Sequence, residues 1–160
     1  MNTIDQDTTT ADRAGVYFSA KTHRSHGKAG ASASDQPSER RKRPFVLVVD
    51  DEPVITETLV DILRHEDFDV AAATDGVSAV EKAASLKPDI VLADVAMPRL
   101  NGVEAAKRIM AASPATRIVL FSGQAETADL LVQARKEGYE FEVLAKPIKP
   151  EHLLRTLRSK

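Results

Sequence analysis

Five apolar segments of strand type, each followed by a segment of helix type, occupy residues 45–160 and strongly limit the possible folds. The strand-type segments lie at 45–49, 68–73, 89–93, 117–121 and 141–145. Apolar side chains at helical spacing follow each of them within a few residues, and Pro150 opens the last helix. Strands that alternate with helices over short connections form a parallel sheet with helices on both faces. The sequence therefore predicts an α/β, doubly wound domain whose five parallel strands have the flavodoxin-like order 2-1-3-4-5.

Residues 1–44 differ in composition from the domain predicted after them. They are rich in Ser, Thr, Ala, Gly and charge, with 8 basic and 5 acidic side chains, whereas residues 45–160 carry 14 and 19. A segment with so little apolar surface cannot offset the entropy lost on ordering. We expect residues 1–44 to be a disordered tail and residues 45–160 to be the folded domain. The basic cluster at 40–43 is interpreted as a solvated linker end, the alternative being a contact for nucleic acid or an acidic partner.

Several classes of protein are disfavoured by what the sequence lacks. The chain has no cysteine, which excludes a disulfide framework and a thiolate metal site. No window approaches the roughly 20 apolar residues of a membrane span. The N-terminus has neither the basic nor the apolar region of a signal peptide, and the net charge of −2 gives no general attraction to nucleic acid. We expect a cytoplasmic protein that does not enter a membrane.

Polar side chains stand at the end of four of the five predicted strands. Asp50 and Asp51 follow the first strand, Asp94 the third, Ser122 the fourth and Lys146 the fifth. The carboxyl ends of parallel strands lie at one edge of the sheet, so these groups are expected to meet. Three neighbouring carboxylates need a cation, and hard oxygen ligands suit Mg²⁺ or Mn²⁺. A lysine and a hydroxyl beside that cation match the charge of a transferring phosphoryl group, which Asp94 could accept as an acyl phosphate.

The segments 46–53, 94–102, 120–123 and 145–148 resemble the receiver domain of bacterial two-component response regulators, and the resemblance covers essentially all of residues 45–160. It implies that Asp94 accepts a phosphoryl group from a histidine kinase or a histidine phosphotransfer protein. Ser122 would be the hydroxyl that turns toward a phosphoryl oxygen, and Lys146 would pair with another oxygen. The resemblance also implies a cis bond between Lys146 and Pro147.

The same resemblance implies a magnesium site. Asp51 and Asp94 would bind Mg²⁺ directly, together with the backbone carbonyl of Ala96, and Asp50 would act mainly through a bound water. Ala96 also bears on the rival interpretation as a phosphotransferase or phosphatase. Such enzymes more typically carry a general acid two residues after the nucleophilic aspartate, and alanine cannot serve as one. We therefore expect a phosphoacceptor signalling domain rather than an enzyme.

One position departs from the family pattern. Receiver domains usually carry an aromatic or histidine ring three residues before the lysine, and Val143 stands there instead. This puts in question the ring that normally moves with the hydroxyl. It also leaves an alternative open, a pseudo-receiver that acts as an interaction module without carrying phosphate.

The chain stops at Lys160, shortly after the last predicted helix, which leaves no room for a DNA-binding output domain. We therefore expect a single-domain response regulator that signals through protein contacts or passes the phosphoryl group on in a phosphorelay. The altered surface is expected around the fourth helix, the fifth strand and the last helix. The resemblance is compatible with a monomer or with a dimer that depends on phosphorylation.

Overall fold

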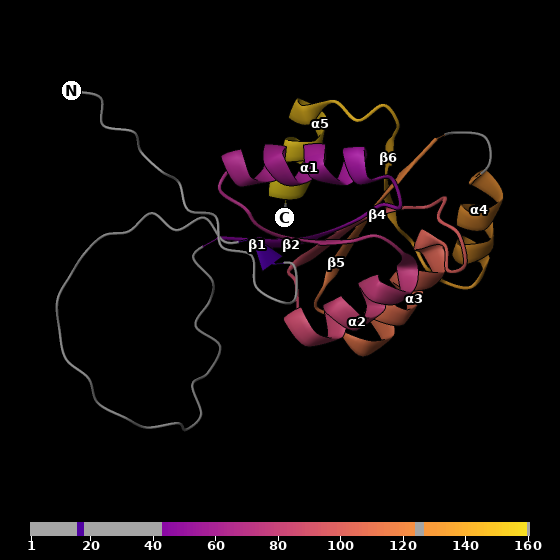
Figure 1. Ribbon diagram of the computed structural model, residues 1–160. Coiled ribbons are helices and arrows are strands. Elements are labelled where there is room, and N and C mark those ends of the chain that lie inside the picture. Colours follow the sequence, from indigo (N-terminus) through magenta and orange to yellow (C-terminus); the bar gives the residue numbers. More distant parts are fainter. Residues whose placement is uncertain (1–15, 18–42, 124–126, 160) are drawn as a thin grey trace, which may run out of the picture.

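The two strands in the middle of the sheet, β2 (Phe45–Val49) and β4 (Ile90–Asp94), are buried at every residue, and all of these residues except Asp94 are apolar. The computed structural model describes residues 16–17, 43–123 and 127–159 (Figure 1). The other strands are β1 (Val16–Tyr17), β3 (Asp69–Ala73), β5 (Arg117–Ser122) and β6 (Glu142–Ala145). The helices are α1 (Pro53–His65), α2 (Gly76–Leu86), α3 (Gly102–Ala112), α4 (Ala128–Lys136) and α5 (Pro150–Arg158).

The predicted topology is confirmed. The strand order is β1-β3-β2-β4-β5-β6, and the last five of these strands are parallel to one another. When the five parallel strands β2 to β6 are numbered 1 to 5 in chain order, this is the arrangement 2-1-3-4-5. Because β2 and β4 are adjacent while their connections run in opposite directions across the sheet, their carboxyl ends border the crevice where ligands bind in such folds.

Alternate residues along each central strand face two separate hydrophobic cores. Val91 and Leu120 belong to the core covered by α2, α3 and α4, whereas Leu92 and Phe121 belong to the core under α1 and α5. Figure 1 shows these two layers of helices on opposite faces of the sheet. The central strands are thus buried on both sides, which explains why β2 and β4 are almost entirely apolar and do not alternate with polar residues.

Side chains and prolines set where the helices begin. Asp75 caps α2 by accepting hydrogen bonds from the backbone N–H groups of Val77 and Ser78, both at 2.9 Å. Asn101 caps α3 in the same way. Proline opens α1 and α5, where its missing N–H costs no hydrogen bond. α4 begins at Ala128, after a buried Thr127.

Val16–Tyr17, within the segment expected to be a disordered tail, form a sixth strand antiparallel to β3. The physical reason is the edge of the sheet. Hydrogen bonds from Asp50 N–H to Ala73 and from Asp69 N–H to Pro44 direct the odd-numbered residues of β3 toward β2. The backbone groups of Val70 and Ala72 therefore face outward, and an exposed edge of this kind favours added strands.

Two groups contact the outward-facing backbone of β3. The register pairs Tyr17 with Val70, and the ammonium group of Lys82 donates a 2.6 Å hydrogen bond to the carbonyl of Ala72. The lysine occupies an acceptor that a longer strand would otherwise use.

Replacing Tyr17 with proline is expected to open this pairing, because proline has no N–H to donate to β3. The amide of Val70 should exchange with solvent on the order of fivefold faster, as measured by hydrogen–deuterium exchange. The amides of Asp69 and Ala71, which face β2, should not change, and a Tyr17→Thr variant, which keeps its N–H, should exchange like the unmodified protein. Unchanged exchange at Val70 in Tyr17→Pro would show that β1 does not protect the edge.

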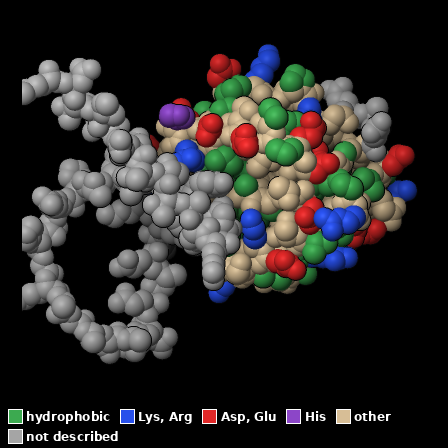
Figure 2. Space-filling view, viewed as in Figure 1, with side chains coloured by type: hydrophobic (Ala, Val, Ile, Leu, Met, Phe, Trp, Pro, Cys, Tyr) green, Lys and Arg blue, Asp and Glu red, His purple; other side chains and the backbone are tan. Residues whose placement is uncertain are grey.

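Acidic and basic side chains are interspersed on the face shown in Figure 2, in line with the small net charge. Of the basic cluster, only Arg43 is among the described residues, and it forms a 3.5 Å ion pair with Asp67. The interpretations of residues 40–42 therefore lie outside the described part of the chain. None of the helices in that part is long and apolar enough to cross a membrane.

Candidate functional site

The end of β2 holds Asp50 in a fully buried position. Its Oδ1 atom accepts a 2.7 Å hydrogen bond from the backbone N–H of Glu52, which turns the chain toward α1. The hydroxyl of Thr56, in the first turns of α1, donates to the backbone carbonyl of Asp50 at 3.1 Å. The Oδ2 atom of Asp50 is buried and has no hydrogen-bond partner. A buried carboxylate oxygen without a partner is costly, and a cation is the group that would satisfy it.

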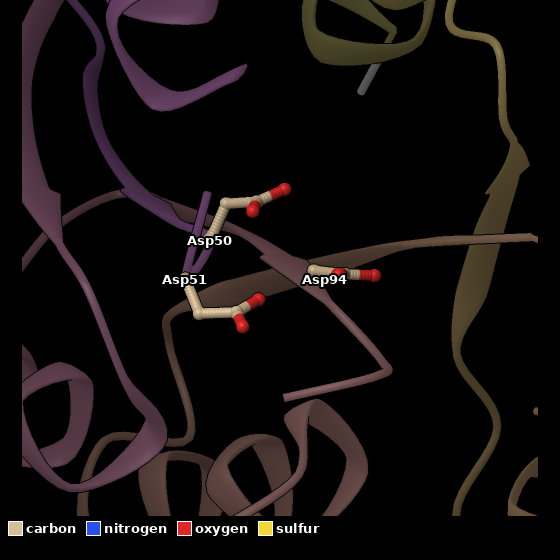
Figure 3. A group of neighbouring side chains, drawn as sticks. All are labelled: Asp50, Asp51 and Asp94. Carbon is tan, nitrogen blue, oxygen red and sulfur yellow. The ribbon is translucent and has the colours of Figure 1, made fainter. Parts of the chain in front are cut away.

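Three carboxylates come together at the ends of β2 and β4 (Figure 3). Asp94 is the last residue of β4 and is 3% exposed, whereas Asp51 is exposed to solvent. Oxygen atoms of Asp50, Asp51 and Asp94 all lie within 4.8 Å of one another. The backbone N–H of Ala96 donates to Oδ1 of Asp94 at 3.3 Å. The grouping predicted from the strand ends is therefore present in the fold.

Lys146 brings a positive charge to this cluster from the end of β6. Its Nζ atom lies 3.0 Å from Oδ2 of Asp94 and 3.6 Å from Oδ2 of Asp50. The same atom lies 5.0 Å from the centre of the Phe121 ring. The backbone N–H of Lys146 donates to the carbonyl of Ser122 at 2.9 Å, and the bond to Pro147 is cis, as the resemblance implied.

Burial and charge act against each other in the pKa values of this group. Burial raises the pKa of Asp50 above its ordinary value, and the neighbouring Asp94 and Asp51 carboxylates add to the rise. The N–H of Glu52 and the charge of Lys146 oppose that rise without cancelling it. Burial by itself lowers the pKa of Lys146, but its hydrogen bond and charge interactions with Asp94 and Asp50 outweigh burial and leave that pKa raised. The ammonium group of Lys146 therefore remains protonated, and its single positive charge is smaller than the negative charge of the carboxylates around it.

Ser122 lies beside Asp94, because Asp94 pairs with Phe121 in the neighbouring strand. The Ser122 side chain is buried, and its hydroxyl forms a short hydrogen bond with the hydroxyl of Thr127. Thr127 is itself 2% exposed, and its hydroxyl also lies 3.5 Å from the carbonyl of Gly123. Sequence reasoning did not identify Thr127 as part of the site. A threonine before a helix is an ordinary capping residue, and nothing in the sequence shows that its hydroxyl is directed at Ser122.

The loop that follows Asp94 is wedged between α2 and α3. A Cβ atom on Gly102 would lie 2.0 Å from the carbonyl oxygen of Asp94, and one on Gly76 would lie 2.3 Å from the carbonyl oxygen of Leu100. Both glycines therefore allow backbone contacts that no other residue permits. Arg99 in the same loop forms a 3.1 Å ion pair with Asp75, the residue that caps α2.

The structure brings together the predicted charged side chains of the site. Asp50, Asp51, Asp94 and Lys146 form one charged cluster, and Ser122 lies next to Asp94 in the sheet. Val143, at the position of the usual ring, is 41% exposed on β6. A partly buried lysine beside clustered carboxylates can neutralise a phosphoryl group held at Asp94, and the carboxylates can hold a divalent cation.

Comparison with known proteins agrees with this site and fold. The family model for the response regulator receiver domain matches residues 46–158. The chemotaxis protein CheY of Thermotoga maritima is 38% identical over 113 residues, which are 70% of this chain and 92% of that protein. The DNA-binding response regulator MtrA of Mycolicibacterium smegmatis is 33% identical over 118 residues, 74% of this chain and 50% of the relative. This chain thus spans about half the length of the MtrA proteins that it matches.

Solved structures give the same result. Chemotaxis protein CheY4 of Vibrio cholerae superposes with a TM-score of 0.65 at 30% identity, covering 72% of this chain and 97% of that one. The signal receiver domain of an HD domain-containing protein from Pseudomonas fluorescens gives a TM-score of 0.67 at 30% identity, covering 73% and 93%. From the fold, the acidic cluster with its lysine, and these matches, the chain belongs to the response regulator receiver domain family.

Proposed function

We propose that this receiver domain accepts a phosphoryl group on Asp94 from a histidine kinase or a histidine phosphotransfer protein. The phosphorylated domain then signals through changed protein contacts or passes the phosphoryl group on. The observation that carries this proposal is the placement of Lys146 Nζ 3.0 Å from Oδ2 of Asp94, inside a cluster of three carboxylates. Asp94 is therefore presented at a strand end beside the charge that a phosphoryl group requires.

In the proposed step, a carboxylate oxygen of Asp94 attacks the phosphorus atom of the donor. A new oxygen–phosphorus bond forms, and the bond between phosphorus and the donor's histidine nitrogen breaks, with its electron pair leaving on that nitrogen. Lys146 keeps its proton, because its pKa is raised, and it pairs with a phosphoryl oxygen. The hydroxyl of Ser122 donates to another oxygen of the same group.

The acidic cluster fits a divalent cation. Asp51 and Asp94 would supply carboxylate ligands together with the backbone carbonyl of Ala96, and Asp50 would act through a water. The buried Oδ2 of Asp50 has no hydrogen bond, and the pKa of that residue is raised despite the Lys146 charge 3.6 Å away; both observations support a divalent cation at this point. When bound, Mg²⁺ or Mn²⁺ supplies charge neutralisation for the phosphoryl oxygens.

The output surface in this proposal consists of α4, β6 and α5. Val132 on α4 and Val143 on β6 are 52% and 41% exposed, and apolar exposed side chains of this kind suit a protein partner. The chemotaxis relative, 92% of which aligns with this chain, supports a receiver that works without an attached output domain. A phosphoryl group adds roughly −1.5 to −2 charge, which is the change that the surface would report.

Asp94→Asn is expected to abolish phosphorylation, because an amide oxygen is too weak a nucleophile for this step. The purified protein would be incubated with a small phosphodonor, with and without Mg²⁺, and its intact mass measured. The unmodified chain should gain one phosphoryl group only with Mg²⁺. Asp61→Asn, which changes an exposed aspartate on α1, serves as the control and should still be labelled.

The same experiment separates this proposal from the alternative. Val143 in place of a ring is the feature that favours a pseudo-receiver, which would bind its partner without phosphate. Labelling of Asp94→Asn equal to that of the unmodified chain would place the phosphoryl group elsewhere. No labelling of the unmodified chain, under conditions that label a known receiver, would favour the pseudo-receiver.

A further inference from the structure

Thr127 is a buried threonine whose hydroxyl is hydrogen bonded to Ser122, the residue that would turn toward the phosphoryl group. Its side chain is 2% exposed, and its hydroxyl is hydrogen bonded to that of Ser122, which is 4% exposed. The two residues lie on either side of the connection from β5 to α4. Both hydroxyls are buried, and besides Ser122 the Thr127 hydroxyl has only the longer, 3.5 Å contact with the carbonyl of Gly123, so breaking the pair has a free-energy cost.

Thr127 also stands at the start of α4 without capping it. A threonine at this position normally has extended backbone angles and accepts a hydrogen bond from an N–H in the first turn. Here its φ and ψ are −109° and −8°, and its side chain makes no cap hydrogen bond. The Thr127 hydroxyl therefore does not cap α4 in this structure. As a cap, it would accept a hydrogen bond from the first-turn N–H group of Asp129 or Leu130.

We propose that Thr127 is a positioning residue that exchanges partners when Asp94 is phosphorylated. Without phosphate it holds the Ser122 hydroxyl away from Asp94. With phosphate, Ser122 turns to a phosphoryl oxygen and the released Thr127 caps α4. The inference rests on the proposed function. A ring at the position of Val143 would normally move together with the Ser122 hydroxyl, and here Thr127 takes that place.

The geometry restricts the movement to side chains and to the start of α4. The carbonyl of Ser122 is held by the N–H of Lys146 at 2.9 Å, and Ser122 pairs with Ala145 in the sheet. The backbone of Ser122 is thus fixed on the β6 side, and rotation of its side chain is the change available. Released from Ser122, the Thr127 hydroxyl lies one residue before the first turn of α4, where it can accept an N–H.

The test uses beryllium fluoride, a non-covalent substitute for the phosphoryl group, added to the full chain with Mg²⁺ and titrated by calorimetry. Thr127→Val keeps the shape of the side chain and removes its hydroxyl. Because Ser122 no longer has to leave a partner, Thr127→Val should bind beryllium fluoride on the order of fivefold more tightly, the effect of one net hydrogen bond. Thr127→Ser keeps the hydroxyl and should bind like the unmodified chain.

A double-mutant cycle isolates the contact from general effects of the substitution. In a Ser122→Ala background, Thr127→Val should leave the affinity unchanged. Thr116→Val is the matched control, since Thr116 is a buried threonine whose hydroxyl donates to Pro88 at the far end of the sheet. It should not alter the affinity. An equal affinity of Thr127→Val and the unmodified chain would overturn the proposal.

A measurement on the unmodified chain keeps the proposal testable even where Thr127→Val folds poorly. Adding beryllium fluoride should slow hydrogen exchange at the amides of Asp129 and Leu130, because capping protects them. Binding of beryllium fluoride without this protection would overturn the role of Thr127 and leave the proposed function intact. Absence of binding would overturn both.

Discussion

Gly102→Ala is expected to destabilise the protein by more than about 3 kcal/mol, at the upper end of what overpacking costs. The added Cβ would lie 2.0 Å from the carbonyl oxygen of Asp94 and 2.8 Å from its carbonyl carbon. Both atoms belong to the backbone of the proposed phosphoacceptor, so no side-chain rotation can relieve the clash. The free energy of unfolding measured in urea should show this loss directly.

Gly123→Ala provides the matched control for that experiment. Gly123 lies in the site region too, but a Cβ there would meet nothing within 4 Å. Its effect on the free energy of unfolding should stay within about 0.5 kcal/mol. Any Gly102→Ala protein that folds should also be phosphorylated more slowly, since the variant displaces the end of β4. Equal stability of the two variants would mean that the close approach at Asp94 is not present in solution.

Asp50→Asn is expected to stabilise the metal-free protein while removing its response to Mg²⁺. The carboxylate of Asp50 is fully buried, and one of its oxygens has no hydrogen bond and only a 3.6 Å ion pair with Lys146, so a neutral amide should raise the free energy of unfolding at pH 7 by about 1 to 3 kcal/mol. In the unmodified chain Mg²⁺ should raise the melting temperature, since a ligand that binds only the folded state stabilises it. In Asp50→Asn that increase should be much smaller.

The pH dependence follows from the direction of the shift. The pKa of Asp50 is raised above its ordinary value of 3.8, so the folded state binds more protons than the unfolded state. Stability should therefore fall as pH rises from about 4 through the raised pKa of Asp50, and Asp50→Asn should lack this fall. Asp61→Asn, with an exposed carboxylate, should keep it. A variant Asp50→Asn that is less stable than the unmodified chain at pH 7 would contradict the prediction.

Much of the site could be predicted because its side chains stand at strand ends. Once the apolar segments define five parallel strands, Asp50, Asp94, Ser122 and Lys146 are placed at one edge by topology alone. The sequence pattern is informative here because a parallel sheet leaves few choices of register. Contacts of this kind follow from the order of strands and need no knowledge of side-chain directions.

Other features depended on information that the pattern does not hold. The pairing of Val16–Tyr17 with β3 joins segments that are more than 50 residues apart, and two residues are too few for a periodic signal. The Ser122–Thr127 contact depends on which way a hydroxyl points at a helix start, where capping would have been the ordinary outcome. The two features that sequence reasoning missed are thus a very short strand and a side-chain orientation.

The wedged loop after Asp94 has a consequence for the direction in which a signal can travel. Gly76 and Gly102 hold this loop against α2 and α3 by backbone contacts, and the Arg99–Asp75 ion pair adds to them. A packed arrangement of this kind resists gradual deformation. We therefore expect the backbone around α2 and α3 to resist displacement when charge is added to Asp94. The resulting change should instead occur across β5, toward α4.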